Sequence, residues 1–326
     1  MPANLTPEYL KAEQRFKEAR SSAEKIVALE EMLTAIPKHK GTEKMQAELK
    51  RRLKKLHGAG QKKSAAKHAL PVYYVKHEGA GQVALVGPPN SGKSSLLAAL
   101  THATPEVADY PFTTRLPWPG MMPFENIQIQ LVDLPPLHAD FPESWVPQAI
   151  RNADAVVLVL DLSEAAVLEQ LTELLAQLEQ AKISIGQRGG EPPWGFLSKP
   201  ALLVGSHCDL PGAEENFQVL AELWRERFRL LSVSARTGEN LELLRRALFE
   251  LLGIVRVYTK IRGSKPDRAN PFVLPRGATV RDVAERVHKE IVTRLKFARI
   301  WGAGKFDGQM VQRDYLVEDN DVIELH

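Results

Sequence analysis

One loop motif constrains this chain more than any other feature. The eight residues that end at Ser94 match the pattern G-x-x-x-x-G-K-[ST] of a phosphate-binding P-loop, with an apolar run at 82–86 before them and a helical run at 95–100 after them. We expect backbone N–H groups and the helix N-terminus to bind phosphates, Lys93 to place a charge near the β- and γ-phosphates, and the Ser94 hydroxyl to ligate Mg²⁺. The predicted phosphate-binding residues are Gly87, Pro88, Pro89, Asn90, Ser91, Gly92, Lys93, Ser94 and Ser95.

Length and composition indicate a multidomain globular protein. At 326 residues the chain exceeds one average domain, and its hydrophobic share of 44% and charged share of 25% are ordinary for a soluble protein. No apolar stretch approaches the ~18 residues of a membrane span, and the first five residues lack signal-peptide features, so we expect a cytoplasmic protein. A single cysteine, Cys208, excludes an intramolecular disulfide and a cysteine-based zinc cluster.

Positive charge is concentrated in the first part of the chain. Residues 1–70 contain 16 Lys/Arg against 8 Asp/Glu, a surplus of 8, so the rest of this chain of net charge +3 carries −5. The densest part lies between Lys38 and Lys67. A basic segment on an otherwise acidic chain predicts contact with a polyanion such as RNA, and a solvated helix face is the alternative interpretation.

The sequence divides into three regions. In residues 1–70, helix-start signals at Thr6, Ser21 and Thr42 precede apolar residues at helical spacing, which predicts a helical hairpin or bundle followed by a linker at 58–69. In residues 71–253, apolar runs without strict alternation alternate with amphipathic helices, which is typical of a doubly wound α/β sheet. The predicted strands are 83–86, 127–132, 155–160, 201–204 and 230–233, and the predicted helices include 164–181, 213–227 and 241–252.

Residues 254–326 predict a small α+β domain. A strand at 255–259 and an extended piece at 272–274 precede one helix that is capped by Thr279. Further extended pieces follow at 296–301 and 321–325. The helix is expected to direct Val280, Val283, Val287 and Ile291 inward.

Two further positions supply groups that a P-loop needs for Mg²⁺ and the γ-phosphate. Phosphoryl transfer requires a hydroxyl on a loop after the first helix and a carboxylate at a strand end. Thr114 is the predicted hydroxyl and Thr113 the alternative, while Asp133 ends the run 127–132 and therefore projects toward the phosphates. The predicted metal ligands are Ser94, Thr114 and Asp133.

The tetrapeptide Ser-His-Cys-Asp at 206–209 lies where guanine-specific proteins present Asn-Lys-x-Asp. Asp209 can accept hydrogen bonds from guanine N1–H and N2–H₂, which adenine does not offer. Backbone N–H groups at Ser234 and Ala235 can meet guanine O6. The predicted base-site residues are Ser206, His207, Asp209, Ser234 and Ala235.

As a set, these motifs resemble a GTPase of the Obg superfamily, and most of all the developmentally regulated GTP-binding protein (DRG) group. The tail resembles the TGS domain, a ubiquitin-like β-grasp module. The resemblance implies GTP and GDP as ligands, slow hydrolysis, a link to the ribosome or RNA through the basic N-terminus and the TGS domain, and neither membrane nor DNA as a partner. The match rests on the P-loop, Tyr110-Pro111-Phe112-Thr113-Thr114, Asp133-Leu134-Pro135, Ser234-Ala235, Val255-Arg256-Val257-Tyr258-Thr259-Lys260, Arg262-Gly263, Pro266-Asp267, Val273-Leu274-Pro275 and Trp301-Gly302.

Three departures from the family pattern bear on activity. Pro136 stands where the pattern has a glycine, and proline has no N–H for the γ-phosphate. Leu137 follows where Ras-like proteins carry a water-positioning glutamine. Ser206-His207 replaces Asn-Lys, and we expect Ser206 to be too short for the usual contacts, while the His207 ring could cover the base.

These departures leave three hypotheses. Related GTPases use an asparagine at the position of Asn90 to help hold K⁺, so the first is a Mg²⁺-dependent, K⁺-assisted GTPase linked to the ribosome or RNA. The second is a GTP-binding adaptor that does not hydrolyse GTP. The third, an ATP-using kinase or ATPase, is disfavoured by Asp209. For the first, the predicted catalytic residues are Lys93, Asn90 and Thr114.

Overall fold

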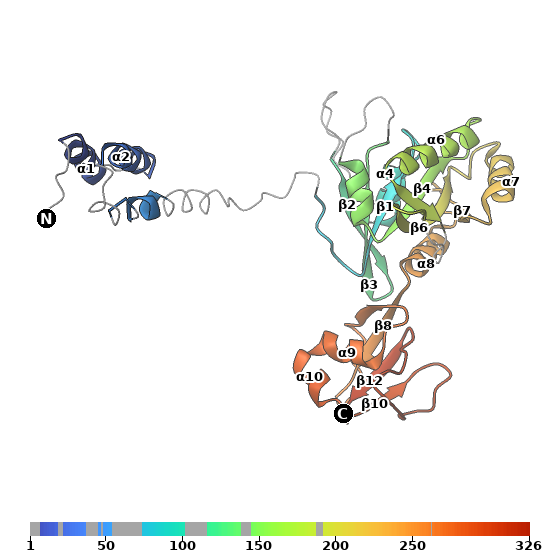
Figure 1. The fold of residues 1–326 in the computed structure, drawn as a ribbon. Helices are drawn as coiled ribbons and strands as arrows, with labels where there is room; N and C mark the ends of the chain where they lie inside the picture. Colours follow the sequence, from blue (N-terminus) through green and yellow to red (C-terminus); the bar gives the residue numbers. More distant parts are fainter. Residues whose placement is uncertain are drawn as a thin grey trace. The chain divides into compact units, whose positions relative to one another are not determined.

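The chain forms two compact units, Met1–Pro71 and Val72–His326. The computed structural model describes residues 7–18, 22–36, 45–46, 48–53, 74–101, 116–137, 145–186, 192–261 and 263–326, and Figure 1 traces the fold. None of the helices in these ranges has the length and apolarity needed to span a bilayer.

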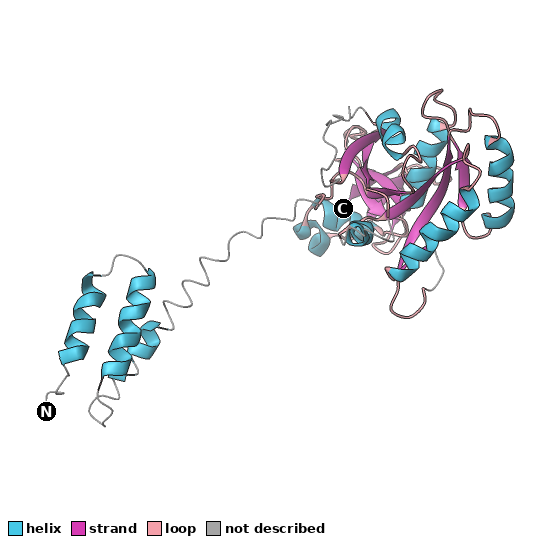
Figure 2. Cartoon of the chain, turned by 90° about the horizontal axis from the view of Figure 1, so that it is seen from above, coloured by secondary structure: helices cyan, strands magenta, loops and turns pink. Residues whose placement is uncertain are grey.

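The N-terminal unit is helical. Helices α1 (Pro7–Glu18) and α2 (Ser22–Ala35) pack side by side, as Figure 2 shows, and residues 48–53 are also helical. An ion pair of 3.0 Å joins Arg15 on α1 to Glu31 on α2. The predicted helix-start residues Thr6, Ser21 and Thr42 lie outside the described residues, as do the predicted linker at 58–69 and much of the basic cluster between positions 38 and 67. Among the described residues of this unit, the buried ones are Tyr9, Ala12, Ala28, Leu29, Met32, Ile36 and Leu49.

A seven-stranded sheet forms the centre of the larger unit. Its strands follow the order β2-β3-β1-β4-β6-β5, and β7 pairs with the second half of β6. All neighbours are parallel except β2 and β3. The strands are β1 (Gln82–Val86), β2 (Trp118–Phe124), β3 (Ile127–Asp133), β4 (Ala155–Asp161), β5 (Ile183–Gly186), β6 (Leu197–Ser206) and β7 (Arg229–Ser232).

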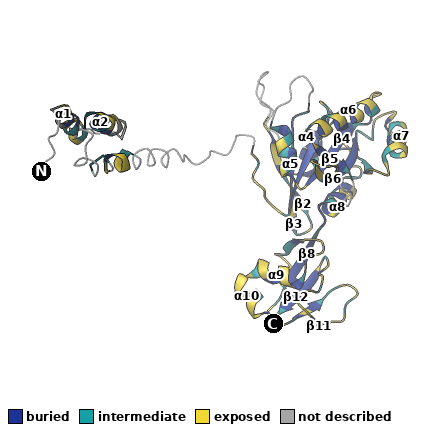
Figure 3. Ribbon diagram, in the orientation of Figure 1, coloured by how far each residue is buried: buried dark blue, intermediate teal, exposed yellow. Residues whose placement is uncertain are grey.

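Helices cover both faces of this sheet, as expected of a doubly wound α/β fold. Successive residues of β1 enter opposite apolar clusters: Ala84 packs with helices α5, α6 and α7, and Leu85 packs with α4 and α8. Figure 3 shows the resulting buried strands between exposed helix faces. The helices are α4 (Lys93–Leu100), α5 (Val146–Asn152), α6 (Val167–Gln180), α7 (Ala213–Trp224) and α8 (Leu241–Leu252).

Two strands of this sheet were not expected from the sequence. Strand β2 contains Pro119 and Pro123, which argue against a strand, but β2 lies at the sheet edge, where a missing N–H costs no ladder hydrogen bond. Strand β5 has only four residues. Neither strand has the long apolar run by which buried strands are recognised in a sequence, and for this reason neither was predicted.

The C-terminal residues form a second sheet with the order β11-β10-β12-β8-β9, in which only β12 and β8 run parallel. Thr279 caps α9 through a capping box with Asp282, as its sequence position predicts. The prediction of one helix that contains both Val280 and Ile291 is wrong. The backbone of His288 is extended and ends the first helix, and Ile291 belongs to a second, shorter helix. The elements are β8 (Ile254–Thr259), β9 (Phe272–Pro275), α9 (Val280–Val287), α10 (Lys289–Arg294), β10 (Ala298–Trp301), β11 (Gln309–Val311) and β12 (Asp321–Leu325).

Arg256 joins the two sheets. Arg256 is only 2% exposed. Its guanidinium donates to Asp319 through Nε (3.0 Å) and Nη2 (2.7 Å), and it also pairs with Glu125 in the β2–β3 turn. The same guanidinium lies over the ring of Phe249 on α8, with 4.9 Å between Arg256 Cζ and the ring centroid. Beside this cluster, Asn126 donates to the Tyr258 hydroxyl at 2.5 Å. The turn between β2 and β3 is thus fixed to the C-terminal sheet.

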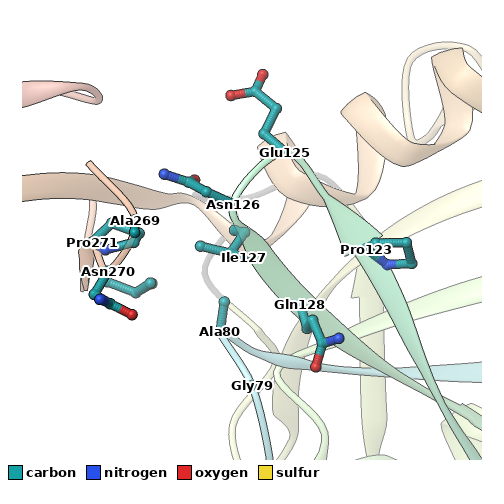
Figure 4. A pocket seen from close by; sticks show the side chains of 11 residues that line it. Gly79, Ala80, Pro123, Glu125, Asn126, Ile127, Gln128, Ala269, Asn270 and Pro271 are labelled. Atoms are coloured by element: carbon teal, nitrogen blue, oxygen red, sulfur yellow. The ribbon is translucent and has the colours of Figure 1, made fainter. Parts of the chain in front are cut away.

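An open cleft of about 560 Å³ flanks this contact. Figure 4 shows residues 269–271 of the C-terminal sheet's first loop on one side of the cleft, and Asn126 and Ile127 on the other.

Replacing Arg256 by alanine should lower the free energy of unfolding by about 3 kcal/mol, because the carboxylates of Asp319 and Glu125 lose a buried cation partner. Urea unfolding followed by circular dichroism measures this loss. Arg299→Ala is the matched control, since Arg299 is exposed on β10 and has no ion pair with the described residues, and it should cost less than about 0.5 kcal/mol. Equal effects of the two substitutions would contradict the role given to Arg256.

Candidate nucleotide-binding site

The carboxyl ends of the central strands bring the predicted site residues to one edge of the sheet. The P-loop follows β1, Asp133 ends β3, and Ser206 ends β6. Leu85 pairs in register with Asp133 on the neighbouring strand, and Asp161 at the end of β4 pairs with Ser206. Parallel α/β sheets bind ligands at this edge. Thr113 and Thr114 lie outside the described residues, so their predicted role stays a prediction.

The P-loop has the close backbone approach that its glycines predict. A Cβ on Gly87 would lie 2.2 Å from the carbonyl oxygen of Val159 on β4, so no side chain fits there. Asn90 and Gly92 both have left-handed backbone conformations, with φ of 59° and 84°. Helix α4 begins directly after Gly92, and the first N–H groups of a helix have no intrahelical acceptor. This loop is a cradle for an anion.

Lys93 lies inside that cradle. Its residue is 7% exposed, and its ammonium donates to the carbonyl oxygens of Gly87 (3.0 Å) and Pro88 (2.7 Å) and to the Ser91 hydroxyl (3.3 Å). A buried ammonium held by neutral oxygens gains a stronger partner when phosphate oxygens arrive.

A hydroxyl and a carboxylate meet beside the loop. Ser94 Oγ donates to Asp133 Oδ2 at 2.5 Å, across 39 residues of sequence. Oxygen ligands of this kind are those that Mg²⁺ prefers, so the two residues predicted from the sequence as metal ligands fit that ion. After Asp133 the chain passes Pro136 and reaches Leu137, which is half-buried against the apolar cluster beside α5.

Ser206 links the base loop to the P-loop. Its hydroxyl lies 2.8 Å from the Ser91 carbonyl and 3.1 Å from that of Leu160, while the expectation that its side chain is too short for the usual contacts stays a prediction. These contacts follow from the close approach of the two loops at Gly92, where a Cβ would lie 3.3 Å from both Ser206 and His207. A serine therefore suffices to join the base loop to the P-loop.

Asp209 has the features of a base reader. Its side chain is 8% exposed, Oδ2 accepts from Arg236 (Nε at 2.8 Å), and Oδ1 is buried without a hydrogen-bond partner among the described residues. Hydrogen bonding to Ser234 is the largest cause that holds the pKa of Asp209 below its ordinary value, and hydrogen bonding to Arg236 is the second. The carboxyl group is therefore ionised at neutral pH. A buried carboxylate oxygen without a donor is costly, and guanine offers two donors. The residues present therefore fit a guanine base.

The loop after β7 differs in part from the prediction. The N–H of Ser234 already donates to the carbonyl oxygen of Glu239 at 3.2 Å, so it is not available for guanine O6. The N–H of Ala235 has no acceptor among the described residues and remains the candidate. Cys208, beside the base reader, stays a neutral thiol because burial, with a smaller contribution from Glu239, raises its pKa to about 11.

Sequence reasoning missed two charged residues at this edge. Asp161 binds the base loop through His207, with Oδ2 at 2.9 Å from Nδ1, and Arg236 pairs with Asp209. Both positions carried a signal. Asp161 ends an apolar run in the same way as Asp133, and Arg236 directly follows Ser234-Ala235.

Comparison with known families agrees with this geometry. Residues 82–187 match a family described as 50S ribosome-binding GTPase, and residues 255–326 match the TGS domain. A protein of Methanocaldococcus jannaschii described as an uncharacterized GTP-binding protein is 31% identical to this chain. The alignment has 362 positions, gaps included, and covers 93% of this chain and 92% of the relative. The chain belongs to the family of GTP-binding proteins that this relative represents.

Other relatives are similar over the same extent. GTP-binding protein 1 of Schizosaccharomyces pombe and the human developmentally-regulated GTP-binding protein 2 are each 26% identical to this chain. Each alignment covers 93% of this chain and 98% of the relative. This DRG-like protein is thus a GTP-binding protein with a GTPase domain followed by a TGS domain, and the first sheet and its helices form that GTPase domain.

Asp209→Asn should weaken GTP binding and favour xanthosine triphosphate, because the amide can donate to the xanthine C2 carbonyl that a carboxylate repels. The ratio of the two affinities should change by about 100-fold or more, as expected when both sides of a buried polar contact exchange donor and acceptor. Competition binding with unlabelled nucleotides measures the ratio. If wild type binds ATP as well as GTP and the substitution changes neither affinity, Asp209 does not read the base.

Proposed function

We propose that this protein is a cytoplasmic, Mg²⁺-dependent GTPase with slow hydrolysis that acts on the ribosome or RNA. The single observation that carries the proposal is the contact of 2.5 Å between Ser94 and Asp133, beside the buried Lys93. A hydroxyl, a carboxylate and an ammonium next to one P-loop are the groups that phosphoryl transfer from a nucleoside triphosphate requires.

Each of these residues has a distinct task. Lys93 would exchange its carbonyl partners for the β- and γ-phosphates, while Ser94, Asp133 and Thr114 would hold Mg²⁺. The metal, when bound, neutralises phosphate charge. The α4 N-terminus orients the phosphates, and Asp209 selects guanine over adenine.

Slow hydrolysis follows from two residues after Asp133. Pro136 has no N–H with which to bind the γ-phosphate, and Leu137 has no polar group with which to orient a water molecule. Asn90 is the remaining candidate for a catalytic group. It is exposed in the P-loop, and it has no hydrogen-bond partner among the described residues, so it is available to help hold a K⁺ ion.

The alternative function, a GTP-binding adaptor that does not hydrolyse GTP, is suggested by Pro136 and Ser206, but the match to a GTPase family does not favour it. An ATP-using kinase or ATPase has no comparable support, because Asp209 favours guanine.

Turnover of GTP should be higher in K⁺ than in Na⁺, and Asn90→Ala should remove the difference without affecting GDP binding, since a positioned cation stabilises charge that develops in the transition state. Phosphate release in matched KCl and NaCl buffers measures it. Asn320→Ala is the control, because Asn320 has a similar left-handed backbone but belongs to the TGS domain. Normal GDP binding with no turnover in either salt would favour the adaptor.

The proposed partner is the ribosome or its RNA, and a protein partner is a further candidate. The support is electrostatic: residues 1–70 carry a surplus of 8 positive charges on a chain whose remainder is acidic. Lysine and arginine contacts with phosphates release counterions, so the affinity depends steeply on salt.

Deletion of residues 1–70 should weaken ribosome or RNA binding and reduce the slope of its salt dependence, because fewer phosphates are neutralised. Co-sedimentation with ribosomes over a series of KCl concentrations measures both quantities. GDP affinity is the internal control and should not change, since the nucleotide-site residues lie between 87 and 236. Equal binding by both proteins would shift the proposed contact to the TGS domain.

A further inference from the structure

His207 replaces the lysine of the family pattern, and its ring contacts two other segments of the site. Its Nδ1 lies 2.9 Å from Asp161 Oδ2, and its Cε1 would lie 3.3 Å from a Cβ built on Gly92. The ring therefore lies between the end of β4 and the start of the phosphate-binding helix. Its side chain is 32% exposed, and Nε2 has no hydrogen-bond partner among the described residues.

The Asp161 carboxylate is fixed at both oxygens. Oδ1 accepts from the Ser163 N–H at 2.8 Å and from the Ser163 hydroxyl at 2.6 Å, which leaves Oδ2 for His207. The side chain is only 15% exposed. Because a carboxylate can only accept, the imidazole carries a hydrogen on Nδ1. The Ser206 hydroxyl also lies 3.2 Å from Nδ1, so the shorter Asp161 contact orients the ring together with Ser206.

The backbone of His207 carries a conformational cost. Its φ of 56° is left-handed, a region that residues other than glycine enter rarely because the Cβ is strained there. The contacts on both sides of the ring, with Asp161 and with Gly92, restrain the residue in this conformation.

We propose that Asp161 is a positioning residue for the guanine nucleotide. It holds the His207 ring against the P-loop, so that the exposed side of the ring forms a wall of the nucleotide site between the phosphates and the base. The pair takes the place of the long lysine side chain. This inference rests on guanine-nucleotide binding by the protein and does not depend on hydrolysis.

The chain contains a matched pair for comparison. His77 and Asp154 also form a histidine–aspartate contact, at 3.3 Å, but Asp154 precedes the same strand β4 at its opposite end. Both side chains of that pair are about half exposed, at 46% and 45%. This pair lies at the opposite end of β4 from the predicted nucleotide site, so substitutions in it show how much the loss of a surface histidine–aspartate pair alone changes GDP affinity.

A double-mutant cycle in the full-length protein tests the proposal. GDP affinity is measured for Asp161→Ala, His207→Ala and the double variant, and urea unfolding of each variant checks that it is folded. Each single substitution should weaken GDP binding by about tenfold, and the double variant should be no more than about twofold weaker still, because the two residues act as one unit. The equivalent cycle on His77 and Asp154 should leave GDP affinity within about twofold of wild type.

A conservative variant separates positioning from structural support. Asp161→Asn keeps the shape of the side chain and one acceptor oxygen. With that oxygen on Ser163, the amide NH₂ donates to Nδ1 of the other imidazole tautomer and still holds the ring, so the variant should bind GDP within about threefold of wild type. Additive losses from Asp161→Ala and His207→Ala, or a loss in unfolding midpoint with unchanged GDP affinity, would overturn the proposal. Absence of GDP binding by the wild-type protein would instead refute guanine-nucleotide binding itself.

Discussion

The nucleotide site depends on close contact between backbone segments at two glycines. At Gly87 the P-loop passes so near β4 that a Cβ would lie 2.2 Å from the Val159 carbonyl oxygen. At Gly92 the loop approaches the base loop closely enough for Ser206 to reach the Ser91 carbonyl. The phosphate cradle and the base reader are thus joined directly, because neither glycine carries a side chain that would separate them. Any larger residue at Gly87 would displace the loop from the strand edge that carries the metal and base residues.

The departures in the base loop have local compensations. Asp161 holds the histidine that replaces the lysine, and Arg236 keeps Asp209 paired. Pro136 differs, because no neighbouring side chain can restore an N–H to a proline backbone. In the proposed function, guanine recognition is therefore kept better than a response to the γ-phosphate.

The two sheets of the larger unit are linked through the strands that form the site. Strand β3 ends at Asp133, beside the P-loop, and begins at the turn whose Glu125 pairs with Arg256 of the TGS domain. A buried guanidinium stacked on Phe249 is expensive to leave unpaired, which keeps this turn against the TGS sheet. One strand pair thus connects the nucleotide edge with the C-terminal domain.

Much of this architecture follows from the sequence. The buried strands and the helix Leu241–Leu252 were predicted from uninterrupted apolar runs and helical spacing, because burial on both faces leaves a strong signal. The edge strand β2 was hidden by its prolines, which are tolerated only where no neighbour needs their N–H. The break at His288 and the availability of the Ser234 N–H depend on hydrogen bonds that no spacing encodes. The positions of Asp161 and Arg236 were visible in the sequence, but their ion pairs with His207 and Asp209 were not, because those partners are distant along the chain.

The most direct test of the central claim is to identify the nucleotide that accompanies the purified protein. The protein is denatured in acid, the released nucleotides are separated by chromatography, and the stripped protein is titrated with GDP and ADP in the presence of Mg²⁺. A guanine nucleotide in the extract and saturable binding of GDP but not ADP are expected. Recovery of an adenine nucleotide, or equal binding of the two diphosphates, would contradict a site in which Asp209 reads the base.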